Sequence, residues 1–347
     1  MAEVLVAMSG GVDSSVAAAL LKQQGHDVVG VTLKLWGGES DSGCCSVSDV
    51  EDARRVAQQL DIDHHVFNFG DDFDRHVIEP YVEAYDQGRT PNPCIECNRH
   101  IKFDKLLRRA DALGFELIAT GHHARIETDA DGVHRIARGA DPAKDQSYVL
   151  HMLGQDQLRR LLLPVGDLTK DGVREMAHEL GLRTADKPDS QDVCFIHSDG
   201  GRRAFLGDRI PLSPAVIVDR EGRQLGHTDA VQLVTIGQRK GLGLAGNDNR
   251  HYITEIDRPN GIVTVGTEEQ TKSGETALVD VGWSSDPVTA GLTVQCSAHG
   301  SRLPGRVLTS ADDRAQVIWD EPHRRVAAGQ AVVFYVGDEV VGGATAS

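Results

Sequence analysis

The chain has 347 residues, enough for two or three domains, and a net charge of −16 from 36 basic and 52 acidic side chains. This acidity argues against indiscriminate binding to nucleic acid but leaves room for a local basic patch. We expect no signal peptide and no membrane-spanning segment, because no apolar run reaches the roughly 18 residues that such a helix needs. Six cysteines are too few for a disulfide framework, which indicates the reducing cytosol.

Strands and helices alternate through the first half of the chain. Apolar runs predict strands at Val4–Met8, Val28–Leu33, Val66–Phe69 and Glu116–Thr120. Amphipathic and capped segments predict helices at Asp13–Gln24, Ser48–Leu60, Asp71–Asp86 and Ile101–Leu113. This order predicts an α/β domain with a parallel sheet covered on both faces, in which ligands bind at the carboxyl ends of the strands.

A glycine-rich loop, Ser9-Gly10-Gly11-Val12-Asp13-Ser14, lies between the first strand and the first helix. Backbone N–H groups and the helix dipole make such a turn a phosphate site, and the glycines let the backbone approach closely. No lysine follows the glycines, so the loop is not of the GxxxxGK[ST] type. The loop predicts ATP cleavage between the α and β phosphates, with pyrophosphate held as the leaving group. Asp13 is expected either to cap the helix or to help bind Mg²⁺, and the sequence leaves both open.

Three cysteines accompany this loop. Cys94 and Cys97 form a CxxC pair, typical of a redox pair, half a metal site, or a nucleophile with a spectator. We expect Asn98 to cap the following helix, which places Cys97 in the positive potential of its N-terminus and favours the thiolate. Cys194 follows the polar run Asp186–Asp192, which is typical of a surface loop. A disulfide between Cys97 and Cys194 requires their Cα atoms to come within roughly 7 Å.

The composition changes after about residue 200, where short β-rich runs separated by turn signals predict small β or α+β modules. The expected domains are 1–204, 205–271 and 272–347. The expected strands are Ala215–Val218, Val231–Ile236, His251–Ile256, Ile262–Val265, Val294–Ser297, Gln316–Trp319 and Ala331–Tyr335.

Together these residues resemble the tRNA-specific 2-thiouridylases, enzymes that place sulfur on C2 of the wobble uridine. The matching motifs run in order along nearly the whole chain: 9–14, 88–94, 97–98, 101–103, 120–122, 144–148, 189–190, 194–196, 237–243 and 329–330. The resemblance implies an ATP-pyrophosphatase domain of the PP-loop type, a small central α+β domain and a C-terminal β-barrel.

The resemblance also implies a mechanism in which ATP, with Mg²⁺, adenylates the uracil C2 oxygen and releases pyrophosphate. A sulfur-carrier protein or cysteine desulfurase then loads a persulfide on Cys194, and its sulfur reaches C2 directly or as hydrosulfide. AMP leaves, and a Cys97–Cys194 disulfide closes the cycle.

Further site residues follow from the same resemblance. Those implied to line the ATP site are Ala7, Met8, Ser9, Gly10, Gly11, Val12, Asp13, Ser14, Leu33 and Gly121. Those implied to contact the tRNA are His122, Lys144, Asp145, Gln146 and Gln330. His123 departs from the family pattern, which often has tyrosine there, and the segment 297–305 matches the barrel-side contacts weakly.

Three alternatives stay open. Cys94, Cys97 and Cys194 are three thiolates, the number that holds a [4Fe–4S] cluster with one open iron, so the same reaction with a cluster-bound sulfide is one alternative. A second is another ATP pyrophosphatase, such as an amidotransferase-like or argininosuccinate-type synthetase, which needs no thiols. A third is an RNA-binding module with a structural zinc at Cys94 and Cys97.

Overall fold

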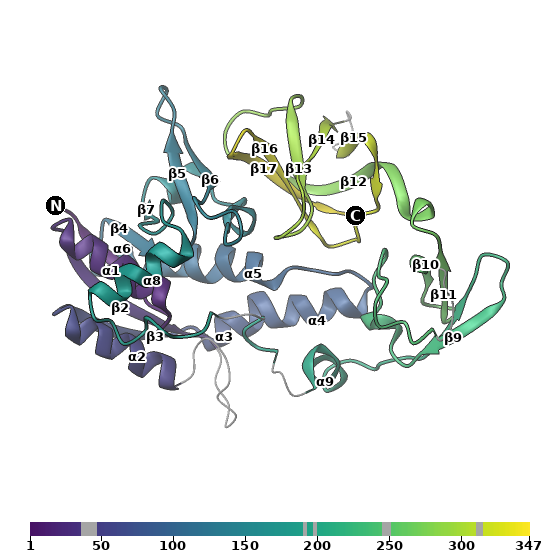
Figure 1. The fold of residues 1–347 in the computed structure, drawn as a ribbon, viewed down its shortest axis with the longest axis horizontal. Coiled ribbons are helices and arrows are strands. Elements are labelled where there is room, and N and C mark those ends of the chain that lie inside the picture. The colour runs from purple at the N-terminus through teal and green to yellow at the C-terminus, as the bar shows by residue number, and fades with distance from the viewer. Residues whose placement is uncertain (36–46, 190–192, 197–199, 245–250, 310–314) are drawn as a thin grey trace.

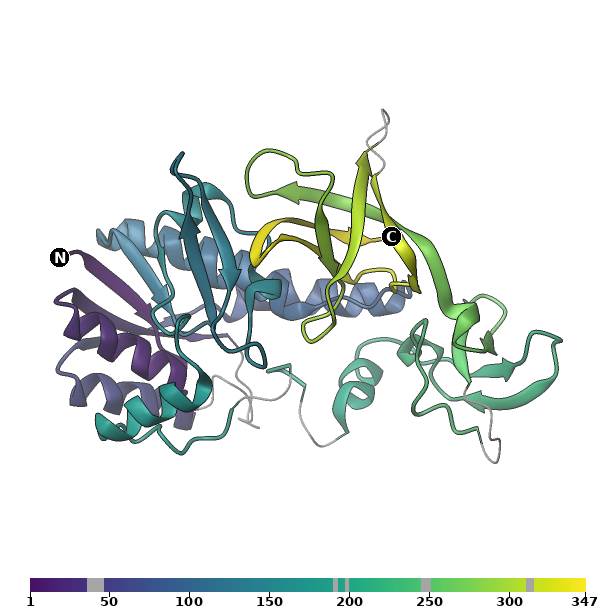
Figure 2. The same cartoon turned by 45° about the horizontal axis from the view of Figure 1, so that its top comes forward.

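The computed structural model describes residues 1–35, 47–189, 193–196, 200–244, 251–309 and 315–347. A parallel sheet with its helices, a small four-stranded sheet and a β-barrel follow one another along the chain (Figures 1 and 2). This architecture confirms the predicted fold class. Within the described ranges, no helix has the length and apolar character needed to cross a membrane.

The N-terminal sheet has five parallel strands in the order β3-β2-β1-β4-β7. They are β1 (Glu3–Ala7), β2 (Asp27–Lys34), β3 (Asp63–Asn68), β4 (Leu117–Thr120) and β7 (Leu161–Leu162). Alternate side chains of β1 enter different apolar clusters, Val4 and Val6 on one face and Leu5 on the other. Both faces of the central strand are therefore buried, as in parallel sheets generally.

Helices cover both faces of this sheet. One face is covered by α1 (Val12–Gln23), α2 (Val47–Gln59) and α8 (Lys170–Glu179). The other is covered by α3 (Gly70–Phe73), α4 (Glu79–Asp86), α5 (Pro93–Glu96) and α6 (Leu106–Leu113). Segments with π-helical hydrogen bonds, Asp74–Ile78 and Cys97–Lys105, join α3 to α4 and α5 to α6. Each pair is thus one continuous helical rod, and π-segments of this kind occur frequently at functional sites.

The central domain begins with α9 (Gly201–Gly207) and holds a sheet in the order β10-β11-β8-β9. Its strands are β8 (Ala215–Val218), β9 (Gln224–Thr228), β10 (Tyr252–Asp257) and β11 (Ile262–Gly266). The strand expected at Val231–Ile236 is wrong, because a 3₁₀ turn covers Val231–Leu233. The buried apolar residues there are Val231 and Val234, whose spacing of three suits a turn rather than the period of two in a strand.

Six strands close into the C-terminal barrel in the order β12-β15-β14-β13-β16-β17, and β12 pairs with β17 to complete the ring. They are β12 (Lys272–Trp283), β13 (Leu292–Gln295), β14 (Leu303–Thr309), β15 (Ala315–Arg324), β16 (Ala331–Val336) and β17 (Glu339–Ala346). Inward-facing apolar side chains such as Val307, Val317 and Phe334 fill its interior. Because the six described strands form a closed ring, the barrel itself has no free strand edge.

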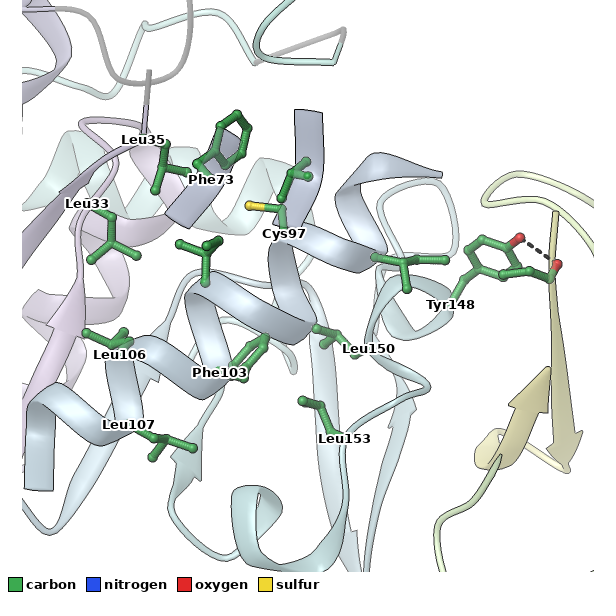
Figure 3. Close-up of a cluster of buried hydrophobic side chains, with 14 of the residues drawn as sticks. Leu33, Leu35, Phe73, Cys97, Phe103, Leu106, Leu107, Tyr148, Leu150 and Leu153 are labelled. Carbon is green, nitrogen blue, oxygen red and sulfur yellow. Dashed lines mark hydrogen bonds between the residues drawn. The ribbon is translucent and has the colours of Figure 1, made fainter. Parts of the chain in front are cut away.

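A hairpin of the N-terminal domain, β5 (Ala124–Thr128) and β6 (His134–Arg138), extends the barrel sheet. Ala137 pairs with Glu339 of β17, and the Arg138 N–H donates to the Asp338 carbonyl at 3.0 Å. Next to it, the buried Tyr148 hydroxyl donates to the Ala331 carbonyl of β16 at 2.8 Å (Figure 3). Backbone and side-chain hydrogen bonds therefore fix the barrel to the N-terminal domain.

Candidate active site

The nucleotide loop lies at the carboxyl end of β1, where it turns into α1. Gly10 has φ +74°, and a Cβ there would overlap the backbone carbonyl of Asp49 in α2, so only glycine fits this position. Gly11 is the N-cap residue of α1, which leaves the first N–H groups of the helix directed at the loop. The Ser14 hydroxyl accepts from the Ser9 N–H at 3.2 Å and closes the turn.

The residues implied to line the ATP site gather at one edge of the sheet. Leu33 is near the end of β2, and Gly121 directly follows β4. A Cβ on Gly121 would lie 2.6 Å from the Ser14 backbone nitrogen, so the chain after β4 packs tightly against the start of α1. Strand ends β1, β2 and β4 thus meet around a loop with phosphate-binding geometry.

Asp13, in the first turn of α1, is held by two partners from distant segments. The Lys170 ammonium donates to both of its carboxylate oxygens at 2.8 Å, and His123 Nε2 lies 3.0 Å from Oδ1. Burial would raise the pKa of Asp13, but the bonds from His123 and Lys170 outweigh it and lower that pKa. Because Gly11 caps α1 and Lys170 occupies both carboxylate oxygens, this conformation favours an anchoring role for Asp13 over helix capping or Mg²⁺ ligation.

Asp189 is a second anionic centre beside this one. It accepts from Lys144 at 2.7 Å and from Arg174 at 2.8 Å, and its Oδ1 lies 2.9 Å from Lys170 Nζ. Burial would raise the pKa of Asp189, but the hydrogen bonds from Lys144 and Lys170 lower it to about 2. The carboxylate is therefore charged at neutral pH and ties three cations together.

Cys97 is the first residue of the π-helical segment and is buried. The helix terminus expected at Asn98 is wrong, because the helix begins at Pro93 and Asn92 caps it by accepting from the Cys94 N–H at 3.1 Å. Asn98 instead lies within the helix, where its side chain donates to the Val149 carbonyl at 2.9 Å. Cys94, rather than Cys97, therefore occupies the first turn, and its side chain is exposed.

Cys97 and Cys194 pack against the same apolar cluster. Figure 3 shows the Cys97 sulfur pointing to the side of the cluster on which Leu33 and Phe73 lie. Cys194 is half-buried against this cluster, and the ring of its neighbour Phe195 is fully buried, 5.8 Å from the Phe73 ring in an edge-to-face pair. Phe195 thus fixes the chain next to Cys194 on the core that holds Cys97.

The residues implied to contact tRNA divide into half-buried and buried members. Lys144 and Gln146 are half-buried, and Gln330 donates from the barrel to the Thr90 carbonyl. Asp145 is buried, where its carboxylate accepts from the Ser147 hydroxyl at 2.9 Å and pairs with Arg138 at 3.2 Å.

His122 is also buried, and its Nδ1 lies 2.7 Å from the Thr120 hydroxyl. Burial lowers the pKa of His122 well below its ordinary value, with Lys102 adding to the effect, so the imidazole is neutral at physiological pH. Its neighbour His123 is the histidine that reaches the nucleotide loop, through Asp13.

The described residues do not offer a set of ligands for a metal cluster in this conformation. Among the described residues, no group of three or more Cys, His, Asp or Glu side chains could hold a metal ion. Cys94 is exposed whereas Cys97 is buried, so the two face different surroundings. The structure therefore does not support Cys94, Cys97 and Cys194 as joint cluster ligands.

Sequence reasoning missed two lysines of this site. Lys170 binds Asp13, while Lys187 donates to the Gly10 carbonyl at 2.9 Å and to Asp49 and Asp52 of α2 at 2.6 and 2.7 Å. The one local signal is Thr169, which caps α8 and places Lys170 at the first helical position, where lysine opposes the helix dipole. A cation at such a position indicates an anionic partner elsewhere in the fold.

Three family models match the chain in succession. They are described as a tRNA methyl transferase HUP domain over residues 2–198, a tRNA methyl transferase PRC-barrel domain over 203–267 and an aminomethyltransferase beta-barrel domain over 275–346. Among solved structures, a 4-thiouridine synthetase–RNA complex with bound ATP is similar over 56% of this chain and 45% of that one, with 18% identity and a TM-score of 0.38.

Curated relatives match the chain from end to end. The tRNA-specific 2-thiouridylase MnmA of Chloroflexus aurantiacus is 48% identical over 352 residues, covering 99% of this chain and 98% of the relative. The MnmA of Geobacter metallireducens is 45% identical over 352 residues, covering 98% and 95%. At this identity and coverage, the chain belongs to the tRNA-specific 2-thiouridylase family.

Proposed function

We propose that this chain is an ATP-dependent tRNA-uridine 2-sulfurtransferase that thiolates C2 of the wobble uridine. The observation that carries the proposal is that the Cys97 sulfur points to the side of its apolar cluster on which Leu33 lies, and Leu33 is near the end of β2 (Figure 3). A site for ATP and a thiol at one edge suit a reaction that activates an oxygen with a nucleotide and then replaces it with sulfur. Its relatives carry the name of this activity.

In the first step, ATP enters with Mg²⁺ on its phosphates and the loop from Ser9 to Ser14 holds the pyrophosphate. The uracil C2 oxygen attacks the α-phosphorus, pyrophosphate leaves, and the oxygen becomes part of an adenylate. This activation is needed because an oxo group is a poor leaving group, whereas AMP leaves readily. Backbone N–H groups at the start of α1 stabilise the charge that develops on the pyrophosphate.

In the second step, a persulfide donor, either a sulfur-carrier protein or a cysteine desulfurase, has already loaded a second sulfur on Cys194. The terminal sulfur attacks C2, and AMP leaves with the former C2 oxygen. The Cys97 thiolate then attacks the Cys194 sulfur, which releases the thiolated base and forms the Cys97–Cys194 disulfide. In this step the Cys97 sulfur is oxidised and the transferred sulfur is reduced, while the Cys194 sulfur stays at the oxidation level it had in the persulfide. An external thiol reductant then reopens the disulfide.

A wobble uridine suits such a site, because an unpaired anticodon base can be turned out of its stack into a pocket. We propose that His122, Lys144, Asp145, Gln146 and Gln330 form the tRNA side of the site. We assign direct contact to Lys144 and Gln146, because both are half-buried rather than buried, and Gln146 accepts from the His123 N–H in the chain that follows β4. Asp145 is buried, so we assign it the support of this segment.

The test is anaerobic turnover of unmodified tRNA with Mg-ATP and a persulfide donor, scored by nucleoside mass spectrometry. Cys97→Ser and Cys194→Ser are each expected to abolish 2-thiouridine while ATP-dependent adenylation of the tRNA continues. Full thiolation by either variant would refute the assigned cysteine roles.

Cys94→Ser is the matched control, because it removes the exposed member of the CxxC pair. The persulfide route predicts that this variant and iron-free protein both stay active. Loss of activity in Cys94→Ser, together with thiolation only after iron reconstitution, would replace the persulfide route by the cluster route.

A further inference from the structure

The peptide bond between Gly10 and Gly11 in the nucleotide loop has a glycine on both sides. Glycine populates backbone conformations that other residues avoid, so the plane of a peptide between two glycines can turn at little cost. A phosphate site needs N–H donors whose direction is fixed before the ligand arrives. This peptide therefore serves the loop only if a neighbouring group holds it in one orientation.

Lys187 holds the peptide by its carbonyl group. The Lys187 ammonium donates to the Gly10 carbonyl at 2.9 Å, and to the carboxylates of Asp49 and Asp52 in α2 at 2.6 and 2.7 Å. An ammonium has three N–H donors, and these three acceptors use all of them. Burial would lower the pKa of Lys187, but the hydrogen bonds to the two carboxylates raise it, so the side chain is a cation at neutral pH. Helix α2 thus orients the ammonium, and the ammonium orients the Gly10 carbonyl.

The planarity of the peptide transmits this orientation to the Gly11 N–H. The described part of the chain has no cis peptide bond, and in a trans peptide the C=O and N–H groups point in opposite directions. Because the Gly10 carbonyl is directed at Lys187, the Gly11 N–H is directed away from it. Among the hydrogen bonds of the described residues, none has the Gly11 N–H as its donor. This N–H is therefore available to a ligand in the loop.

The next peptide, between Gly11 and Val12, is held by helix α1 itself. The Gly11 carbonyl accepts from the Ser15 hydroxyl at 2.8 Å and from the Ser14 hydroxyl at 3.2 Å. Since this carbonyl points into the helix, the Val12 N–H points out of the helix N-terminus. The peptide before it depends instead on Lys187, a side chain 177 residues away in the sequence.

We propose that Lys187 is a positioning residue that directs the Gly11 N–H at a phosphate oxygen of the bound nucleotide. The inference rests on the proposed function and deepens it, because it concerns the loop that holds the pyrophosphate. The Gly11 N–H donates to the phosphate, whereas Lys187 stays on the carbonyl side of the peptide and does not touch the ligand. Without the ammonium, the peptide can turn, and the loop loses one of its donors.

The experiment measures the binding of Mg²⁺-pyrophosphate to the full chain by calorimetric titration. Lys187→Met keeps the length of the side chain but removes all three donors. It is expected to weaken pyrophosphate binding by about tenfold or more, the loss typical of one hydrogen bond to a charged group. Adenosine has no phosphate, so its affinity, measured by equilibrium dialysis, is expected to match the wild type. Equal weakening of both ligands would reveal a general disturbance of the site and overturn the proposal, as would wild-type affinity for pyrophosphate.

Two further variants separate orientation of the peptide from neutralisation of charge. Arg183→Met removes another cation from Asp52, whose Oδ1 lies 3.0 Å from Arg183 Nε, but it leaves Gly10 untouched. Its affinity for pyrophosphate is expected to match the wild type. The double variant Lys187→Met/Asp52→Asn removes one of the carboxylate charges that Lys187 balances, and it is expected to bind as weakly as Lys187→Met. Recovery of wild-type affinity in the double variant would overturn the proposal, because charge alone would then explain the effect.

The Gly11 N–H can also be observed directly in the unaltered chain. The sequence has four Gly-Gly pairs, at 10–11, 37–38, 200–201 and 342–343, so glycine labelled with ¹³C at the carbonyl and with ¹⁵N limits an HNCO spectrum to four amides. Gly11→Ala identifies the Gly11 signal, since a Cβ there would meet Ser9 Oγ at an ordinary 3.5 Å. The Gly11 proton is expected to shift downfield when Mg²⁺-pyrophosphate is added, because it donates to an anion. A signal that does not respond at saturating pyrophosphate overturns the proposal, even if Lys187→Met does not fold.

These readouts need neither tRNA nor a sulfur donor, so they separate the role of Lys187 from the proposed function. A chain that thiolates tRNA but shows no effect of Lys187→Met on pyrophosphate binding contradicts only the positioning role. A chain that shows this effect but makes no 2-thiouridine contradicts only the proposed function.

Discussion

Phe195 offers a test of how the core positions Cys194, the cysteine proposed to carry the sulfur. Its ring is 1% exposed, and it makes edge-to-face contacts with Phe73 and Tyr81 at centroid distances of 5.8 and 5.3 Å. Phe195→Ala would leave a cavity and lower the free energy of unfolding by about 3–5 kcal/mol. With a loss of this size, a local effect on Cys194 would be hard to separate from unfolding of the whole chain. Phe195→Leu fills most of the space and loses mainly the ring–ring contacts, a cost of about 1–2 kcal/mol.

The expected result for Phe195→Leu is a folded chain whose Cys97–Cys194 disulfide forms more slowly under mild oxidation by diamide. Unfolding in urea, followed by circular dichroism, measures the stability cost, and peptide mapping measures the disulfide. Phe334→Leu is the matched control, because Phe334 is equally buried but lies in the barrel core. Equal disulfide rates in the wild type, Phe195→Leu and Phe334→Leu would refute the idea that Phe195 places Cys194.

Two further predictions concern the nucleotide loop and its anionic neighbour. Gly10→Ala is expected to abolish nucleotide binding, because its Cβ would overlap a backbone carbonyl. Gly25→Ala is the control: Gly25 has a similar positive φ but open space around it, so the change should lower the free energy of unfolding by only about 1 kcal/mol. Equal losses for the two variants in calorimetric titration and thermal unfolding would contradict the steric argument. The lowered pKa of Asp189 means that its carboxylate stabilises the fold above the ordinary value of 3.8, and that this stability is lost as the pH falls toward about 2. Asp189→Asn should therefore unfold with a free energy about 2 kcal/mol lower than the wild type at pH 7. Urea titrations should show that this difference in stability disappears between about pH 4 and pH 2. A difference that stays constant with pH would argue against the assigned ion pairs.

Four of the five strands of the parallel sheet, all except the two-residue β7, and the nucleotide loop could be predicted, because each is encoded by adjacent residues. An apolar run gives β1, and the two glycines after it give the turn. The start of the helix before Cys97 was misplaced, because two asparagines compete as caps. Pro93 at the first helical position is the local signal that favours Asn92.

What could not be predicted depends on partners far apart in the chain. Lys170 is an ordinary lysine until the fold brings Asp13 and Asp189 to it. The hairpin of β5 and β6 was missed for the same reason. Each of its strands has only one or two apolar residues between charged or polar ones, so no apolar run marks them as strands. They join the barrel sheet because β17 lies alongside β6.

The pairing of β6 with β17 has a consequence for synthesis on the ribosome. The N-terminal domain emerges first, yet the strand that pairs with its hairpin is the last strand described in the chain. Until β17 has been made, β6 presents an unpaired edge, and such edges recruit strands from other chains. Arg135 and Arg138 on this strand oppose such misassembly through their charge. A nascent chain that stalls before β17 is therefore expected to expose an unpaired strand edge on its N-terminal domain, which makes it a substrate for chaperones and proteases.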